Sequence, residues 1–386
     1  MNIAILIPSL RMGGAERAAT LLGDHLKKIG HKVFFFLMAE HGRNFFDVKC
    51  EIVDTHIPYP YSYSSVWDEL RELVFATRSL KKYKKMYHID VAVSFMEAYN
   101  ILNILSKRKG ERVYASVRTV LSVRNEFKGL IYNPNLLRYV YDMADAVISV
   151  SDGVKRDLIE NYRIKSSKIT TISNVSDCEV CYGDFVEDAR TKDVLFVGRL
   201  DPVKQVDVII RAFSYVCTND ETARLVIVGE GKKKAELLEL SRSLGIDDKI
   251  VFTGMCKNVG GYLKKCGCFV MASKAEGFPN AMVEAMSYGV PVISTDSPGG
   301  CGEIVGKKGN VRSIQFCEYG ILVPYILANQ SQNDCLSSKE ELLGKAILYL
   351  LNDVSMRDRY SKSSKRRSQY YMPERIFSLW DKILKI

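Results

Sequence analysis

Residues 269–294 read FVMASKAEGFPNAMVEAMSYGVPVIS. The apolar run Phe269–Met271 predicts a buried strand, the segment after it predicts a helix, and Val292–Ser294 predicts the next strand. Pro279 suits the first position of the helix, and Gly289 suits its end. A strand, a helix and a second strand in this order make a βαβ unit, so the stretch predicts a parallel sheet.

The same alternation of strand and helix patterns continues on both sides of this unit. In the first half we expect strands at Ile3–Ile7, Lys32–Phe36, Val91–Phe95, Val113–Ser116 and Ala146–Val150, with helices at about 15–29, 66–86, 98–108, 133–143 and 152–162. In the second half we expect strands at Val194–Val197, Leu225–Val228, Ile250–Phe252, Phe269–Met271, Val292–Ser294 and Ile321–Val323. The sequence predicts two doubly wound α/β domains in tandem, which suits a chain of 386 residues.

The alternation lapses between the two series, where residues 176–191 are polar and have no clear period, so we expect a linker there. The first domain is then 1–175 and the second is 192–370. Residues 371–386 carry apolar side chains at helical spacing and predict a last helix that packs back onto the first domain. These side chains are Ile376, Phe377, Leu379, Trp380, Ile383 and Leu384.

Composition narrows the class of protein. A hydrophobic fraction of 47% with 26% charged residues is typical of a globular protein rather than a disordered or fibrous one. No apolar run approaches the roughly 20 residues that span a bilayer, and the first residues are typical of a buried strand rather than a secretory signal. We therefore expect a cytoplasmic protein that is soluble or peripheral on the inner face of the cell membrane, with its ten cysteines reduced.

The net charge of +10 favours anionic partners, and it does not choose among nucleic acid, lipid head groups and diphosphate-bearing substrates. A metal role for the cysteines is not expected. Neither Cys178 with Cys181 nor Cys266 with Cys268 is accompanied by a second pair at ligand spacing.

Three turns, each after a predicted strand, carry candidate functional residues, and such turns meet at one edge of a parallel sheet. In the first, Gly198 precedes Arg199 and Lys204, two cations that could hold a diphosphate or could be solvated surface charge. In the second, Gly229 and Gly231 could let a base or ribose lie against the backbone. A strand-to-helix turn also uses glycine for its geometry alone.

The third turn, residues 273–286, carries the strongest signal. A helix that begins near Pro279 presents free backbone N–H groups and the positive end of its dipole to an anion. Glu276 lies in the loop and Glu284 about one turn into the helix, so both carboxylates could face one pocket. A carboxylate can accept two hydrogen bonds from the vicinal hydroxyls of a ribose or hexose.

The paired glutamates Glu276 and Glu284 resemble the signature of glycosyltransferase family 4. The turn at Gly198–Lys204 resembles the diphosphate-binding turn of that family, and Gly13–Arg17 is similar to its amino-terminal glycine-rich loop. The resemblance covers nearly the whole chain. It implies a GT-B fold of two Rossmann-like domains facing a central cleft, in which the second domain binds the donor nucleotide and the first binds the acceptor.

The resemblance also implies roles for single residues. Arg199 and Lys204 would neutralise the diphosphate leaving group and, with Glu276 beside the transferred sugar, form the catalytic set. Glu284 would hold the ribose hydroxyls, and Gly14 would let the first-domain loop approach the phosphates. The other donor-binding residues implied are Gly198, Gly229, Gly277, Phe278, Pro279 and Asn280.

The expected activity is retaining transfer of a hexose or N-acetylhexosamine from a nucleotide diphosphate-sugar, with UDP as the expected nucleotide. The acceptor is expected to be a glycan or a polyprenyl-diphosphate-linked saccharide, in polysaccharide biosynthesis. No cofactor, metal or nucleic acid is expected, because two fixed cations and a helix amino terminus can stabilise the leaving group. No Asp-x-Asp pair follows a predicted strand.

The first domain departs from many members of the family, which carry a histidine near the fifth strand. This chain has Ser116 and Arg118 there, preceded by Asn100, which is similar to a bacterial surface-polysaccharide branch with a Ser-x-Arg-Asn motif. Thr119 stands where that branch has asparagine. The expectation for Ser116, Arg118 and Asn100 is contact with the donor sugar or with the acceptor, whose phosphate Arg118 could touch.

The segment Asp68–Tyr87 mixes apolar residues with six basic ones, and Trp67 precedes it. It could rest on an anionic membrane surface and receive a lipid-linked acceptor. The charged outer face of an ordinary helix explains the same pattern.

Two other functions fit parts of the sequence. One is a non-catalytic subunit that binds a nucleotide sugar, against which the joint presence of Arg199, Lys204, Glu276 and Glu284 speaks. The other is a GT-B epimerase acting on a UDP-sugar, which would form product from donor alone. A nucleotide-dependent dehydrogenase is not favoured, because the first turn lacks Gly-x-Gly-x-x-Gly.

Overall fold

The computed structural model describes residues 1–11, 13–37, 46–57, 65–123, 133–176, 191–256, 258–327 and 336–386. The chain divides into two compact units. Unit 1 comprises Met1–Val175 together with Pro373–Ile386, and unit 2 comprises Ser176–Met372. Most of the expected linker, including Cys178 and Cys181, lies outside the described residues.

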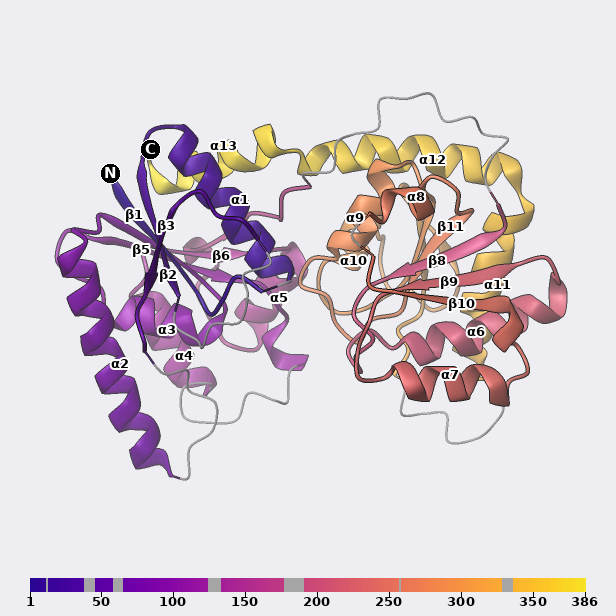
Figure 1. Cartoon of the computed structure of the whole chain (residues 1–386), viewed down its shortest axis with the longest axis horizontal. Coiled ribbons are helices and arrows are strands. Elements are labelled where there is room, and N and C mark those ends of the chain that lie inside the picture. The colour runs from indigo at the N-terminus through magenta and orange to yellow at the C-terminus, as the bar shows by residue number, and fades with distance from the viewer. Residues whose placement is uncertain are drawn as a thin grey trace. The chain divides into compact units, whose positions relative to one another are not determined.

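Unit 1 is built on a parallel sheet of seven strands in the order β3-β2-β1-β4-β5-β6-β7 (Figure 1). The strands are β1 (Asn2–Ile7), β2 (Lys32–Leu37), β3 (Glu51–Asp54), β4 (Val91–Phe95), β5 (Arg112–Val117), β6 (Ala146–Ser149) and β7 (Ile169–Thr171). The helices are α1 (Gly14–Lys28), α2 (Val66–Met86), α3 (Glu97–Leu105), α4 (Pro134–Asp142), α5 (Asp152–Glu160) and α13 (Pro373–Leu384). Helices α1 and α13 cover one face of the sheet, and α2, α3 and α4 cover the other (Figure 1).

The carboxyl-terminal helix α13 completes the core of unit 1. Its buried side chains Ile376, Trp380 and Leu384 join the same apolar cluster as alternate residues of β1 and the inner face of α1. His25 of α1 stacks on Phe377 with the ring centroids 4.2 Å apart. The same histidine hydrogen-bonds Asp381 at 2.8 Å.

Unit 2 repeats the architecture with the strand order β10-β9-β8-β11-β12-β14-β13. Its strands are β8 (Asp193–Val197), β9 (Arg224–Val228), β10 (Ile250–Gly254), β11 (Cys268–Met271), β12 (Val292–Thr295), β13 (Gln315–Phe316) and β14 (Ile321–Val323). Its helices are α6 (Val206–Asn219), α7 (Lys234–Ser243), α8 (Gly260–Leu263), α9 (Asn280–Ser287), α10 (Cys301–Val305), α11 (Ser338–Asn352) and α12 (Val354–Ser368). Among the described strands of this sheet, only β13 pairs antiparallel, with β14.

Every strand expected from the sequence is present, three short strands were not expected, and one expectation needs correction. The edge strands β3, β7 and β13 have only two to four residues, too few to produce a readable pattern. Pro279 caps α9 with φ −79° and ψ 81°, so the helix begins at Asn280 rather than at the proline. The two cysteines near β11, Cys266 and Cys268, are buried among apolar neighbours.

Replacing Trp380 tests how much unit 1 depends on α13. Trp380→Ala empties a buried site beside the Phe95 ring, whose centroid lies 6.3 Å from that of the indole. It should lower the free energy of unfolding of unit 1 by about 3–5 kcal/mol, measured by urea denaturation. Leu379→Ala on the exposed side of the same helix is the matched control. Equal stabilities of the two variants would contradict the packing described.

Candidate functional site

Backbone hydrogen bonds join the first two candidate turns of unit 2, which follow β8 and β9. Gly198 donates its N–H to the carbonyl of Val228 at 3.0 Å, and Leu200 donates to the carbonyl of Glu230 at 2.9 Å. The turns after β8 and β9 therefore continue the ladder of the sheet beyond the strands. Residues that follow them are held at fixed positions along the carboxyl edge of the sheet.

Glycine is required in the second of these turns. Gly229 has φ +150°, and a Cβ atom there would lie 1.9 Å from the carbonyl oxygen of Gly198. A Cβ on Gly231 would lie 2.3 Å from the carbonyl oxygen of Leu200. Close approach of the two turns explains both glycines, which is the geometric alternative that the sequence left open.

Lys204 and Glu276, 72 residues apart in the chain, meet in the structure. The Nζ of Lys204 lies 2.5 Å from Oε1 of Glu276. Ser273 donates its hydroxyl to the same carboxylate oxygen at 2.6 Å. The Glu276 side chain is 10% exposed and that of Lys204 is 22% exposed. The pair is thus largely sheltered from solvent, with enough access to exchange partners.

A fourth loop, which the sequence analysis did not single out, holds Glu276 by its backbone. Glu276 donates its N–H to the carbonyl of Pro298 at 3.0 Å and accepts from Gly300 at 2.9 Å. These bonds form an isolated parallel bridge between Glu276 and Gly299. The signal for this loop was Pro298-Gly299-Gly300 shortly after the strand β12.

Arg199, the second cation of the expected clamp, has a different partner. Its guanidinium pairs with Asp201 of the same turn at 3.1 Å, and its side chain is 65% exposed. The structure therefore brings Lys204 and Glu276 into contact. Arg199, which belongs to the same turn as Lys204, does not join them and lies on the surface. An exposed pair of this kind contributes little to stability, so Arg199 can turn to another anion at low cost.

The remaining donor-site candidates lie on or near α9. Gly277 and Phe278 are buried, and the Phe278 ring makes an edge contact with Tyr371 at 5.1 Å between centroids. Asn280 begins α9 and Glu284 lies in its second turn, both half-buried. Gly14 is exposed at the first position of α1 in unit 1.

In unit 1 the candidates Ser116 and Arg118 lie at the carboxyl end of β5, and Asn100 lies in α3, the helix that follows β4. Arg118 donates to the Ser116 hydroxyl at 3.1 Å and to the side chain of Asn174, a residue that the sequence analysis did not single out. Asn100 and Ser116 are fully buried. This burial does not fit the expected contact of Asn100 with a sugar, because its amide is occupied by Ser94, the Ser116 carbonyl and Tyr141.

Two further features concern binding of a metal ion and crossing of a membrane. Within the described ranges, no three His, Cys, Asp or Glu side chains gather as a metal ion would require. Among the helices that the structure describes, none is both long and apolar enough to cross a membrane.

Two family models match the chain. Residues 12–180 match "Glycosyltransferase Family 4" and residues 184–318 match "Glycosyl transferases group 1". A relative from Campylobacter jejuni is 28% identical over 96% of this chain and 95% of its own length. It is named "N-acetylgalactosamine-N,N'-diacetylbacillosaminyl-diphospho-undecaprenol 4-alpha-N-acetylgalactosaminyltransferase".

Solved structures share the fold. The Anabaena protein HepE, crystallised with UDP and glucose, superposes with a TM-score of 0.74 at 17% identity and covers 99% of both chains. TarM of S. aureus, crystallised as a mutant with UDP and two saccharide ligands, gives a TM-score of 0.76 at 12% identity over both whole chains. These neighbours are GT-B glycosyltransferases, so each unit has the Rossmann-like architecture of that fold.

The close approach of the first two turns makes Gly229 intolerant of a side chain. Gly229→Ala should displace the backbone of Gly198, whose N–H bonds the Val228 carbonyl, and lower the melting temperature of unit 2 by several degrees, because about 2 kcal/mol or more of strain is introduced. Differential scanning calorimetry measures the shift. Gly261→Ala is the matched control, because a Cβ there meets nothing within 4 Å. An unchanged transition in Gly229→Ala would disprove the tight packing.

Proposed function

This chain carries the two domains of a family 4 glycosyltransferase, and from that premise we propose that it is a retaining, metal-independent hexosyltransferase. Its donor is a UDP-linked hexose or N-acetylhexosamine. Its acceptor is a glycan or a polyprenyl-diphosphate-linked saccharide in polysaccharide biosynthesis. The observation that carries the proposal is the sheltered contact between Lys204 and Glu276 at the carboxyl edge of the sheet.

The leaving group determines what the donor site must do. When the glycosyl bond breaks, negative charge grows on the diphosphate oxygens, and fixed cations stabilise that charge. Lys204 supplies one such charge from a sheltered position, and Arg199 supplies another from the same turn. Backbone N–H groups at the start of α9 add dipoles of the same sign. This set needs no metal ion for neutralisation.

The two carboxylates, Glu276 and Glu284, contact opposite ends of the nucleotide sugar, the transferred sugar and the ribose. Glu276 sits within 2.5 Å of the Lys204 ammonium and receives the Ser273 hydroxyl, so its position is fixed before a ligand arrives. It lies beside the transferred sugar and balances the positive charge of the oxocarbenium-like transition state. Glu284, farther along α9, accepts hydrogen bonds from the ribose hydroxyls.

The glycines and the residues around α9 complete the donor site by backbone contact. Gly198 and Gly229 have no side chain, so the backbone of the first two turns is accessible to a ligand at these two positions. Gly277 and Phe278 direct backbone N–H groups toward the phosphates. Pro279, which has no N–H, caps α9, and Asn280 begins that helix beside them. The Phe278 ring itself packs on Tyr371, so only its backbone is offered to a ligand.

The relatives support the donor and acceptor classes. Two solved neighbours were crystallised with UDP, one together with glucose and the other with sugar derivatives. Two Campylobacter relatives, at 28% and 25% identity, have diphospho-undecaprenol or PP-undecaprenol in their names. In unit 1, Arg118 contacts the acceptor or the donor sugar, and the fully buried Ser116 and Asn100 position it from within the core.

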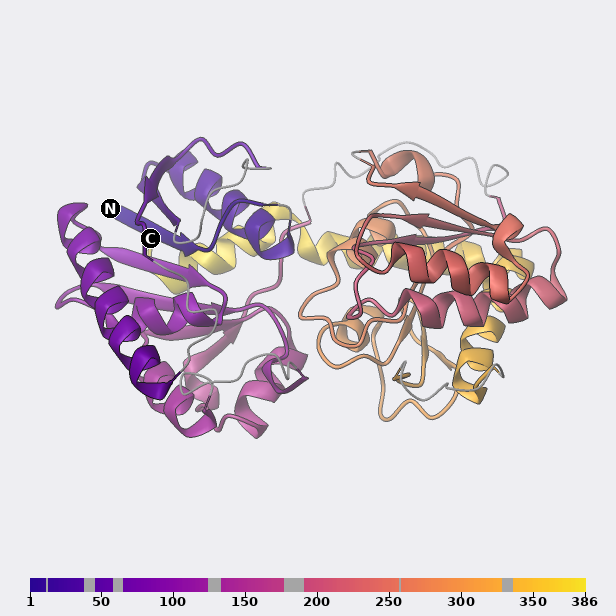
Figure 2. The same cartoon turned by 60° about the horizontal axis from the view of Figure 1, so that its bottom comes forward.

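A peripheral membrane position suits a lipid-linked acceptor. Helix α2, seen on the outside of unit 1 in Figure 2, presents one exposed face. That face carries Trp67, Arg71, Val74, Phe75, Arg78, Lys81, Lys82 and Lys85. Its aromatic end enters the head-group region of an anionic inner leaflet and its basic end binds lipid phosphates. Lys84 takes no part, because it is fully buried and pairs with Glu111.

The decisive experiment screens radiolabelled nucleotide sugars with a lipid-linked acceptor extract, with and without chelator. Transfer to the acceptor that survives chelation supports the proposal. Product formed from donor alone indicates an epimerase, and donor binding without turnover indicates a non-catalytic subunit. Loss of transfer on chelation contradicts metal independence. The anomeric configuration of the product, read by NMR, tests retention.

Removing the positive charge of Lys204 should greatly slow the sugar-transfer step. Lys204→Met is expected to lower kcat about 10²–10³-fold, because a sheltered cation at the leaving group is lost. Arg199→Met should have a smaller effect. Lys192→Met, which removes a half-exposed lysine paired with Asp220 in the same unit, is the control and should keep full activity. A rate unchanged by Lys204→Met would refute the assigned role.

Vesicle binding tests the face of α2. Sedimentation with vesicles of phosphatidylglycerol should carry down the wild-type protein, and neutral phosphatidylcholine vesicles should not. Arg78→Gln and Lys82→Gln should each weaken binding by about 1 kcal/mol, and Trp67→Ser should weaken it further. Tyr139→Ser, at an exposed aromatic of α4, is the control. Wild-type binding that ignores lipid charge would exclude this mode of attachment.

A further inference from the structure

Arg118 occupies an unusual electrostatic position in unit 1. It follows Val117, the last residue of β5, and its guanidinium carbon lies 5.2 Å from the centroid of the Phe95 ring. Two of its N–H groups are used, one by the Ser116 hydroxyl at 3.1 Å and one by Asn174. Its Nε is buried and has no acceptor among the described residues.

Every contact of this guanidinium that the structure describes is electrically neutral. A phenyl ring, a hydroxyl and an amide surround it, and no carboxylate forms an ion pair with it within the described ranges. Burial alone lowers the pKa of Arg118 to about 9. A desolvated cation is costly unless a counterion compensates it, and buried charges in proteins are paired for that reason.

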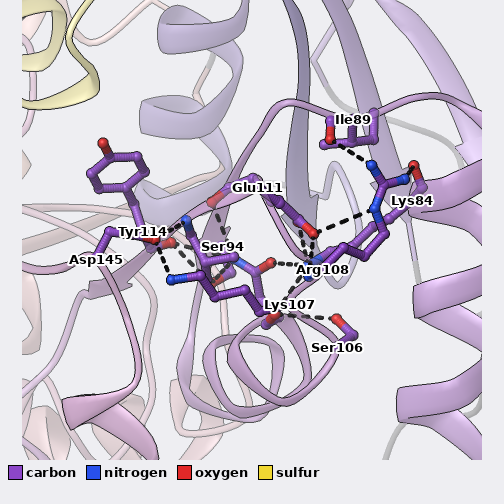
Figure 3. Close-up of polar contacts among 12 residues, drawn as sticks. Lys84, Ile89, Ser94, Ser106, Lys107, Arg108, Glu111, Tyr114 and Asp145 are labelled. Atoms are coloured by element: carbon purple, nitrogen blue, oxygen red, sulfur yellow. Dashed lines mark hydrogen bonds and ion pairs between the residues drawn. The ribbon is translucent and has the colours of Figure 1, made fainter.

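A network of buried hydrogen bonds holds the end of β5, from which Arg118 follows. Asn100 donates to the Ser116 carbonyl at 3.0 Å and accepts from Ser94 at 2.8 Å. Asn103 donates to Ser94 at 3.1 Å, and the buried ammonium of Lys84 donates to Asn103 at 2.7 Å. Figure 3 shows part of this polar network, including Lys84 and Ser94. Satisfied buried networks of this kind are rigid, so the loops that hold Arg118 are pre-organised.

We propose that Arg118 is the counterion for a phosphoryl group brought by a substrate. The proposal rests on the proposed function, because both the nucleotide sugar and a polyprenyl-diphosphate-linked acceptor carry such a group. Three of the five guanidinium N–H groups have no acceptor in the described residues. They suffice for a bidentate pair to one phosphate, the geometry that arginine favours.

A neutral sugar is the weaker occupant. Hydroxyl groups could satisfy the open N–H donors, but they would leave the positive charge without compensation. The Ser116 and Asn174 side chains already supply neutral oxygen acceptors, so a further neutral ligand would repeat what is present. An oxyanion satisfies the donors and the charge together. This argument favours a phosphate over the sugar among the contacts considered for this residue.

Binding of UDP and of inorganic pyrophosphate tests the proposal on the full chain. Isothermal titration calorimetry measures UDP first, and then pyrophosphate with UDP held at saturation. If the acceptor supplies the phosphate, Arg118→Met should leave UDP affinity unchanged and weaken pyrophosphate binding roughly 10- to 100-fold. If the donor supplies it, UDP affinity itself should fall by that factor. Arg118→Lys should lose less than Arg118→Met in either case.

Arg156→Met, at an exposed arginine of α5 in the same unit, is the matched control and should bind both ligands as the wild type does. Circular dichroism and the melting temperature show whether Arg118→Met is folded, and Arg118→Lys provides the comparison if it is not. Unchanged binding of both ligands in the folded Arg118 variants overturns the proposal. A wild type that binds these ligands but transfers no sugar would refute the enzyme function while leaving the Arg118 site standing.

Discussion

The contact between Lys204 and Glu276 is the interaction on which the proposed donor site depends. It joins the loop after β8 to the loop after β11, and it forms because neighbouring parallel strands deliver their loops to one edge. The backbone prepares it: Lys274 donates to the Val203 carbonyl at 2.7 Å, next to both members of the pair. Glu276 is in turn fastened to the loop after β12. These backbone bonds hold the two loops together, so the two side chains start from positions within reach of each other.

Much of this arrangement followed from local sequence patterns. The strands around the site are continuous apolar runs, because a parallel sheet is buried on both faces, and such runs are readable without an alignment. Lys204 and Glu276 stood out because each follows such a run. Short edge strands such as β3 and β13 gave no pattern, since two to four residues cannot establish a period. The role of the Pro298–Gly300 loop was visible only in the bridge between Glu276 and Gly299.

Contacts between residues far apart in the chain could not be predicted from local sequence patterns. Asn174 lies 56 residues after Arg118, in a segment with no regular structure, and nothing in its neighbourhood marks it as a partner. The same holds for the buried amide of Asn100, for which the family resemblance implied contact with a substrate. The sequence indicates which polar residues follow strands. The packing of the helices decides which of them reach solvent, and this is a property of the whole unit.

The two cations differ in what a phosphate must displace. Lys204 already has a carboxylate at 2.5 Å, so a diphosphate that binds it has to share or replace Glu276, and part of its attraction is spent on that exchange. Arg118 has only neutral contacts in the described residues, so an oxyanion there displaces no charge and removes the cost of a desolvated cation. In the proposed donor site, Glu276 would compete with the diphosphate for the lysine, and the product would leave readily. A site without a counterion holds its anion more firmly, which suits an arginine that positions a substrate rather than one that expels a leaving group.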